Sequence, residues 1–217
     1  MVNRSAEDYI KAVYALQVFG GRVTTSAVAS RLHIANSSVS AMLKKLSRER
    51  LLHYKPYQGV TLTVAGRRMA LKIIRRHRLW EVFLAKRLGF PWDEVHDEAE
   101  RLEHVTSEEL ERKLDESLGF PPSDPHGDPI PSAGGNVRAR SSRSLAMCGE
   151  GDRVKVVRVS DRAPSLLRHA ARLGLALDAR VTVKELMNFD GSMIVKVGPH
   201  DRFISRQVAE AIFVRPD

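Results

Sequence analysis

The chain has 217 residues, of which 43% are hydrophobic and 28% charged, and its formal net charge is +9. This composition supports folded cores, and no apolar run reaches the roughly 18 residues of a membrane span. The N-terminus also lacks the apolar stretch of a signal peptide, so we expect a cytoplasmic protein with no membrane partner. The single cysteine, Cys148, excludes an internal disulfide and a cysteine-based zinc site.

Positive charge is concentrated in the first 80 residues. Residues 1–80 contain fifteen Lys or Arg against three Asp or Glu, whereas residues 81–118 contain five against twelve. The balance therefore changes from +12 to −7, and the remaining residues carry +4. Such a change of sign predicts a nucleic-acid-binding segment followed by a cation-binding one.

Three helices are predicted at the N-terminal end. The first begins with Ser5 as N-cap and stops at Gly20, and apolar residues recur along it at helical spacing. A second, short helix begins at Thr25, and a third is capped by Asn36 or Ser37 after a tight turn. Two short helices joined in this way are typical of a helix-turn-helix.

A wing and a DNA-contacting helix complete this pattern. Residues 51–54 and 60–63 form two strand-like runs around a turn, as in a hairpin. In the third helix, serines can approach base edges or phosphates, and lysines can contact phosphates. The predicted DNA-binding residues are Ser37, Ser38, Ser40, Lys44 and Lys45. Because no Arg or Gln leads this helix, we expect modest direct base readout and substantial dependence on DNA shape.

In the rest of the chain, the sequence pattern changes twice, from helical to loop-like and then to strand-like. A basic helix that begins near Ala65 is followed by an acidic helical segment, about 78–118, interrupted only at Gly89-Phe90-Pro91. Residues 119–144 are rich in Pro, Gly and Ser, which predicts an extended loop and linker. From about residue 145, short strands with turns and one short helix predict a small β-barrel of SH3-like type.

Hard metal ligands gather at helical spacing in the acidic segment. At about 100° per residue, four of them share roughly a quarter to a third of a helix circumference. They are His96, Glu100, Glu103 and His104. His77 and Glu81 form an i,i+4 pair on the preceding helix. Imidazole and carboxylate without thiolate suit manganese, iron(II), cobalt or zinc, so the sequence predicts a site for one of these metals.

Each of these residues has a simpler interpretation when taken alone. Asp8, three positions after Ser5, would complete a capping box, and Glu100 or Glu103 could be a solvated helix carboxylate. Asp124 and His126 stand in a Pro- and Gly-rich stretch, where ordinary turn chemistry explains them equally well. The combination of carboxylates and histidines on one arc nevertheless favours metal binding.

The same motifs resemble the diphtheria-toxin-repressor and manganese-transport-regulator family over essentially the whole chain. The matching segments are Glu7-Asp8-Tyr9, Ser37–Ser40, Arg76–Leu79, Val95–His104 and Pro125–Pro131. The resemblance implies a mainly α fold with a smaller β part. Its three domains would be a winged helix-turn-helix at 1–72, a helical metal-binding and dimerisation domain at 73–140, and an SH3-like (FeoA-type) domain at 145–217.

The resemblance also implies a homodimer that binds operator double-stranded DNA when it is loaded with metal, with two metal sites in each subunit. The primary-site positions are matched by Asp8, Glu100, Glu103 and His104. His77 matches a ligand of either site, and Glu81 and His96 match the ancillary site. Asp124 and His126 are added as further predicted ligands.

Departures from the family pattern bear on the metal. Iron-selective members carry Met and Cys where Asp8 and Glu100 stand, so this site resembles the manganese branch, with Mn(II) favoured over Fe(II). The carboxylate that the manganese branch would align with Lys11 is absent, and Asp124 stands where some members have Cys. Some members draw ancillary ligands from the SH3-like domain; here Ala163 and Ser165 cannot act as acidic ligands, and Asp161 is a candidate.

The hypothesis is therefore a metal-dependent transcriptional regulator, a repressor by family, that controls metal homeostasis genes and is not an enzyme. One alternative is a carboxylate/His metalloenzyme, which needs an open coordination position and a substrate pocket that the sequence does not identify. The other is a metal-independent winged-helix regulator that senses a small molecule. Metal dependence of operator binding distinguishes all three.

Overall fold

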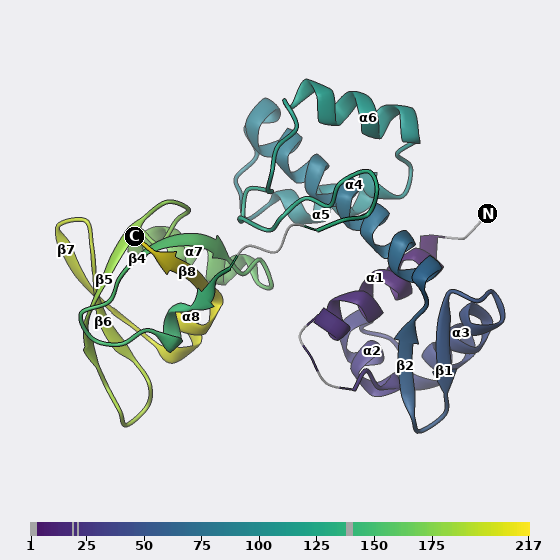
Figure 1. Ribbon diagram of the computed structural model, residues 1–217, viewed down its shortest axis with the longest axis horizontal. Coiled ribbons are helices and arrows are strands. Elements are labelled where there is room, and N and C mark those ends of the chain that lie inside the picture. The colour runs from purple at the N-terminus through teal and green to yellow at the C-terminus, as the bar shows by residue number, and fades with distance from the viewer. Residues whose placement is uncertain (1–3, 19, 21, 138–140) are drawn as a thin grey trace. The chain divides into compact units, whose positions relative to one another are not determined.

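The computed structural model describes residues 4–18, 20, 22–137 and 141–217, and they form helices at the N-terminal side and a sheet at the C-terminal side (Figure 1). The chain divides into two compact units, each made of separate segments. Unit 1 comprises Met1–His77, Glu100–Glu111 and Pro131–Val137. Unit 2 comprises Arg78–Ala99, Arg112–Ile130 and Arg138–Asp217.

Unit 1 contains the predicted helix-turn-helix and wing. Its elements are α1 (Arg4–Val18), α2 (Thr25–Leu32), α3 (Asn36–Arg48), β1 (Leu52–Lys55) and β2 (Gly59–Leu62). The Thr24 hydroxyl accepts the Ala27 N–H at the start of α2, and His33 in the left-handed region, at φ 55°, ends it. The strands pair antiparallel, and Ile10, Leu43 and Leu46 are fully buried between these elements.

Two of the predicted helix caps are wrong. Helix α1 begins at Arg4, so Ser5 lies inside it and is not the N-cap. The N-cap of α3 is Ala35, which contributes no side-chain hydrogen bond, and Asn36 is already helical. The polar residues at this end therefore leave their side chains available for other contacts.

Helix α4 (Val64–Leu88) is continuous and passes through both units. The Thr63 hydroxyl caps it by accepting the Gly66 N–H, and it also donates to the Leu51 carbonyl. In unit 1, Arg75 and Arg76 each donate to Glu111, at 2.9 Å, and so attach the start of α6 to this helix. In unit 2, Leu84 of α4 packs with residues of α5.

The acidic segment forms α5 (Val95–Glu103) and α6 (Glu108–Ser117). The predicted interruption near residue 90 is confirmed, but the sequence did not predict the second break, between Glu103 and Glu108. Val95 and Ala99 of α5 are fully buried. Within the described ranges, no helix is long and apolar enough to cross a membrane.

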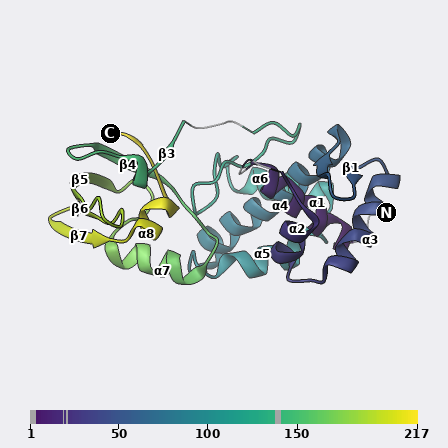
Figure 2. The same ribbon diagram turned by 90° about the horizontal axis from the view of Figure 1, so that it is seen from below.

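The C-terminal part of unit 2 is a six-stranded antiparallel sheet in the order β3-β8-β4-β5-β6-β7. The strands are β3 (Arg143–Ser144), β4 (Arg153–Val159), β5 (Arg180–Leu186), β6 (Met193–Val197), β7 (His200–Ile204) and β8 (Ile212–Pro216). Leu167 and Ala170 of α7 (Pro164–Leu173) and Ala209 of α8 (Arg206–Ala211) join its core, and Figure 2 shows both helices beside the strands. Among the described strands, β3 and β7 do not pair, so the predicted SH3-like barrel is not closed and the sheet is open.

Candidate metal centre

Asp8, Glu103 and His104 converge in unit 1. Each offers one ligand atom, and these atoms lie within 4.8 Å of one another. The Asp8 Oδ1 and His104 Nε2 atoms are 2.9 Å apart, and His104 Nε2 lies 3.4 Å from Glu103 Oε1. Both Asp8 Oδ1 and His104 Nε2 are buried and make no hydrogen bond. Because buried polar atoms almost always have a partner, this pair fits a site built for a cation.

The His104 ring is held from its other side by Glu7. The Glu7 Oε2 atom lies 2.6 Å from His104 Nδ1. A carboxylate at one imidazole nitrogen fixes the tautomer and directs the lone pair of the other nitrogen toward a metal. Sequence reasoning included Glu7 in a motif but gave it no role. Its position directly before Asp8 and its carboxylate were the only available signals.

The pKa values of Asp8 and Glu103 are shifted in opposite directions. Burial raises the pKa of Asp8; the charge of His104 opposes this rise, and the nearby carboxylates of Glu100 and Glu103 add to it. Burial also opposes ionisation of Glu103, but the hydrogen bond with His77 and the charge of Lys11 outweigh it, so the pKa of Glu103 is lowered. A divalent cation would favour the ionised form of both carboxyls.

Glu100 lies beside this group without entering it. Its side chain is 41% exposed, and its Oε2 lies 3.7 Å from Lys11 Nζ. Among the described residues, Glu100 is not part of the ligand group formed by Asp8, Glu103 and His104. The capping alternative for Asp8 loses its basis, because Ser5 is not an N-cap.

A second group, buried in unit 2, consists of Glu81, Asp124 and His126. His126 Nδ1 lies 3.9 Å from Glu81 Oε2 and 4.0 Å from Asp124 Oδ1. His126 Nε2 lies 2.7 Å from the Trp92 carbonyl oxygen, which requires a proton on Nε2. In the neutral ring, Nδ1 is then a bare acceptor; it is buried, has no hydrogen-bond partner, and faces two carboxylates. This tautomer is suited to a metal ligand.

Asp124 is held in place and electrostatically crowded. Its Oδ1 accepts the backbone N–H groups of His126, at 2.8 Å, and Asp128, at 3.0 Å. Burial raises the pKa of Asp124 well above its usual value, and the charges of Glu81 and Asp128 raise it further, while Arg78 acts in the opposite direction. Asp161 also raises this pKa, which places its charge near the group.

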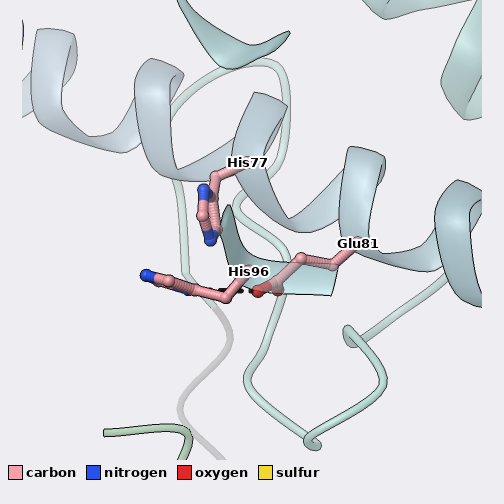
Figure 3. A group of neighbouring side chains, drawn as sticks. All are labelled: His77, Glu81 and His96. Atoms are coloured by element: carbon pink, nitrogen blue, oxygen red, sulfur yellow. Dashed lines mark ion pairs between the residues drawn. The ribbon is translucent and has the colours of Figure 1, made fainter. Parts of the chain in front are cut away.

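His77, Glu81 and His96 also form a set with ligand atoms within 4.8 Å (Figure 3). His77 and Glu81 lie one turn apart on α4, and His96 Nδ1 is 3.5 Å from Glu81 Oε1. Glu81 is fully buried and belongs to both this set and the one with Asp124 and His126. His77 Nδ1 also lies 2.5 Å from Glu103 Oε2, so His77 adjoins the first group as well.

Comparison with known proteins identifies the family of the chain. Family models described as the iron dependent repressor N-terminal DNA binding domain, its metal binding and dimerisation domain, and the FeoA domain match residues 1–60, 63–132 and 143–216, respectively. The iron-dependent repressor IdeR of Mycobacterium leprae (strain TN) is 32% identical over 223 residues, which cover 97% of this chain and 96% of that protein. The chain belongs to the iron-dependent repressor family.

Solved structures of this family are similar over the full length. A manganese-dependent transcriptional repressor in complex with manganese is 41% identical, with a TM-score of 0.92, and the match covers 98% of this chain and 100% of that one. The manganese regulator SloR is 30% identical, with a TM-score of 0.82, and the match covers 98% of each chain. This family member is therefore a metal-dependent transcriptional regulator and not an enzyme. Its partners are operator DNA and a second copy of the chain.

In this repressor fold, α3 presents most of the predicted DNA-binding side chains. Ser37, Ser38, Lys44 and Lys45 are exposed. Ser40 is half-buried and hydrogen-bonds with Tyr54 of β1. Hydrogen bonds from Thr25 and then Ser40 lower the pKa of the Tyr54 hydroxyl. Ser40 thus ties α3 to the wing, a role that its sequence position did not indicate.

Proposed function

We propose that the protein is a manganese-responsive repressor, with Fe(II) as the second candidate ion, and that it controls metal homeostasis genes. The observation that carries this proposal is the approach of Asp8 Oδ1 to His104 Nε2, two buried atoms 2.9 Å apart without a hydrogen bond. Oxygen and imidazole donors without sulfur suit Mn(II). The similar manganese-dependent repressors support the same choice of ion.

Two metal sites per subunit follow from the ligand groups. Asp8, Glu103 and His104 would hold the primary ion, with Glu100 at its margin. Glu81, Asp124 and His126 would hold the second ion, with His77 and His96 next to Glu81. The domain division that accompanies this assignment is 1–72 for DNA binding, 73–140 for metal binding and dimerisation, and 145–217 for the FeoA-type domain.

The primary site would act as a clamp within unit 1. Asp8 belongs to α1 of the DNA-binding part, whereas Glu103 ends α5. In the absence of metal, Asp8, Glu100 and Glu103 repel one another and resist closure. A bound divalent ion supplies the positive charge that removes this repulsion. Metal binding by these ligands then favours the DNA-competent arrangement of the protein over its other arrangements. In a dimer, the two α3 helices would enter major-groove faces about 34 Å apart, or a multiple of this distance.

Serine and lysine side chains of α3 would make the DNA contacts. Ser37 and Ser38 are exposed at its first turn, and Lys44 and Lys45 supply positive charge further along. Ser40 would act through Tyr54. A regulator that binds operator DNA works in the compartment that holds this DNA, so the proposed location is the cytoplasm.

Metal-controlled DNA binding tests the proposal. Full-length protein is stripped of metal and titrated onto operator DNA with Mn(II), Fe(II), Zn(II) or chelator. Specific binding is expected with Mn(II) and should be lost with chelator. His104→Ala should lose the Mn(II) response while the dimer stays folded, because it removes one ligand of the clamp. His169→Ala, which changes an exposed histidine of α7, should respond like the wild type.

Equal operator affinity in metal-free and Mn(II)-loaded protein would refute the clamp. A response to Fe(II) at lower free concentration than to Mn(II) would reverse the proposed metal preference. Circular dichroism and sedimentation measure whether His104→Ala is still a folded dimer.

A further inference from the structure

The ammonium group of Lys11 lies inside the ligand cluster of unit 1. Lys11 Nζ donates to both carboxylate oxygens of Glu103, at 2.9 and 2.8 Å, although Glu103 is fully buried. It also lies 3.7 Å from Glu100 Oε2 and 3.4 Å from His77 Nδ1. The Lys11 side chain is only 19% exposed. A positive charge thus occupies a pocket formed by two carboxylates and an imidazole.

This position is separate from the one where Asp8 meets His104. Asp8 Oδ1 and His104 Nε2 face each other without a hydrogen bond, whereas the Lys11 ammonium is surrounded by Glu100, Glu103 and His77. Glu103 contributes to both places, since its Oε1 lies 3.4 Å from His104 Nε2 while both of its oxygens contact Lys11. The cluster therefore contains two adjacent cation positions that share one carboxylate.

Charge balance gives the two positions different occupants. Glu7, Asp8, Glu100 and Glu103 bring four negative charges, and Lys11 returns one positive charge. One divalent ion beside Lys11 leaves the cluster with a net charge of −1, whereas two divalent ions beside Lys11 would make it +1. A second divalent ion would have to replace or repel the ammonium, because the two would lie only a few ångströms apart at low dielectric.

We propose that Lys11 is a built-in cation that fills the second position of this cluster, so that the Asp8–Glu103–His104 site binds one divalent ion where the surrounding ligands could hold two. The inference rests on the proposed function, because it takes this cluster to be the primary metal site. Lys11 thereby sets the number of ions at the site, and loss of its charge opens the position between Glu100, Glu103 and His77 to metal.

The number of Mn(II) ions bound per subunit tests this inference. Full-length protein is saturated with Mn(II) by equilibrium dialysis, and metal and protein are quantified. Lys11→Glu replaces the ammonium with a carboxylate and should bind one more Mn(II) per subunit than the wild type. Lys11→Met removes the charge and adds only a thioether, a poor ligand for Mn(II), so it should also gain one ion, but at higher free Mn(II). Lys11→Arg retains the charge and should keep the wild-type number.

Electron paramagnetic resonance locates the gained ion. Two Mn(II) ions that share Glu103 are spin-coupled, so the six-line signal per bound Mn(II) should fall in Lys11→Glu relative to the wild type. The matched control is Lys113→Glu, the same charge reversal at a 62% exposed side chain of α6. It should alter neither the number of bound Mn(II) ions per subunit nor the six-line signal per ion.

If Lys11→Glu and Lys11→Met both bind the same number of Mn(II) ions per subunit as the wild type, the inference is overturned, even if the wild type binds Mn(II) at Asp8 and His104. Failure of the proposed function would give a different result: His104→Ala would bind as many Mn(II) ions per subunit as the wild type. If Lys11→Glu does not fold, Lys11→Met alone decides the matter.

Discussion

At the scale of single residues, one imidazole links two neighbours on α1. Glu7 contacts Nδ1 of His104 at 2.6 Å, and Asp8 approaches Nε2 of the same ring at 2.9 Å. Helical spacing predicted Glu103 and His104, because ligand types at that spacing are visible in the sequence, and the family resemblance implied Asp8. Glu7 could not be predicted in the same way, since its role depends on where α1 lies against the end of α5.

Glu7→Ala should weaken Mn(II) binding at the primary site about 10- to 100-fold, the usual effect of removing a carboxylate that orients a histidine ligand. Isothermal titration calorimetry with Mn(II) measures the change. Glu94→Ala, at an exposed position before α5, is the control and should bind as the wild type does. Unchanged affinity in Glu7→Ala would mean that His104 needs no such support.

Asp124 gives a residue-scale prediction about pH. Its pKa in the folded, metal-free protein is raised above the ordinary 3.8, chiefly by burial. A raised carboxyl pKa stabilises the fold below the unfolded value, and this contribution is lost as the pH rises through the folded value. At neutral pH, metal-free Asp124→Asn should therefore be more stable than the wild type, by about 1–3 kcal/mol, the scale of a poorly compensated buried group.

Urea unfolding of both metal-free proteins between pH 3 and 8 measures this difference, which should shrink toward the acid end. Asparagine keeps an oxygen for the backbone N–H groups of His126 and Asp128, so the loop should remain formed. Saturating Mn(II) should reverse the order, because only the wild type retains the carboxylate ligand. A stability difference that does not vary with pH would contradict the electrostatic explanation.

At the scale of elements, periodicity predicted helices better than their ends or long-range partners. Spacing within one helix is local, so the convergence of Glu103 and His104 followed from sequence. The ends depend on single hydrogen bonds, and the cap of α3 was wrong for that reason. Glu81 lies close to Asp124 and His126, which belong to a loop more than 40 residues further along the chain. No periodic pattern encodes such a long-range contact. The open sheet likewise depends on strand order, not on strand pattern.

The close contact between α4 and the wing is testable at Gly66. A Cβ atom at this position would lie 1.9 Å from the Leu51 carbonyl oxygen, a backbone atom that side-chain rotation cannot move away. Gly66→Ala should therefore displace α4 from the strand that follows α3 and cost about 1–3 kcal/mol of stability, typical of overpacking.

Urea denaturation of metal-free protein checks this cost, and operator binding should weaken in parallel because the wing is displaced. Gly149→Ala is the matched control: its Cβ would meet no atom within 4 Å, so its unfolding midpoint should equal that of the wild type. A wild-type midpoint in Gly66→Ala would show that the helix start can shift without loss.

At the scale of the whole molecule, the charge distribution separates two tasks along the chain. Residues 1–80 carry +12 and include the exposed lysines of α3, while residues 81–118 carry −7 and supply most of the metal ligands. The net charge of +9 therefore understates the field at the DNA-binding part. The small or lysine side chains on α3 favour phosphate contact and DNA shape over base readout.

Operator binding by the Mn(II)-loaded dimer should consequently be strongly salt-dependent. A protein that makes about 6–10 phosphate contacts loses roughly 10³- to 10⁵-fold in affinity between 50 and 200 mM salt. Lys44→Ala should weaken binding to all DNA sequences alike and reduce the slope of log affinity against log salt by about 1 for each phosphate contact removed. Fluorescence anisotropy with operator and scrambled DNA measures both effects. Lys184→Ala, an exposed lysine of β5, is the control and should keep the wild-type slope. If Lys44→Ala also keeps that slope, Lys44 does not contact a phosphate, and the positive face of α3 acts only by attracting DNA from a distance.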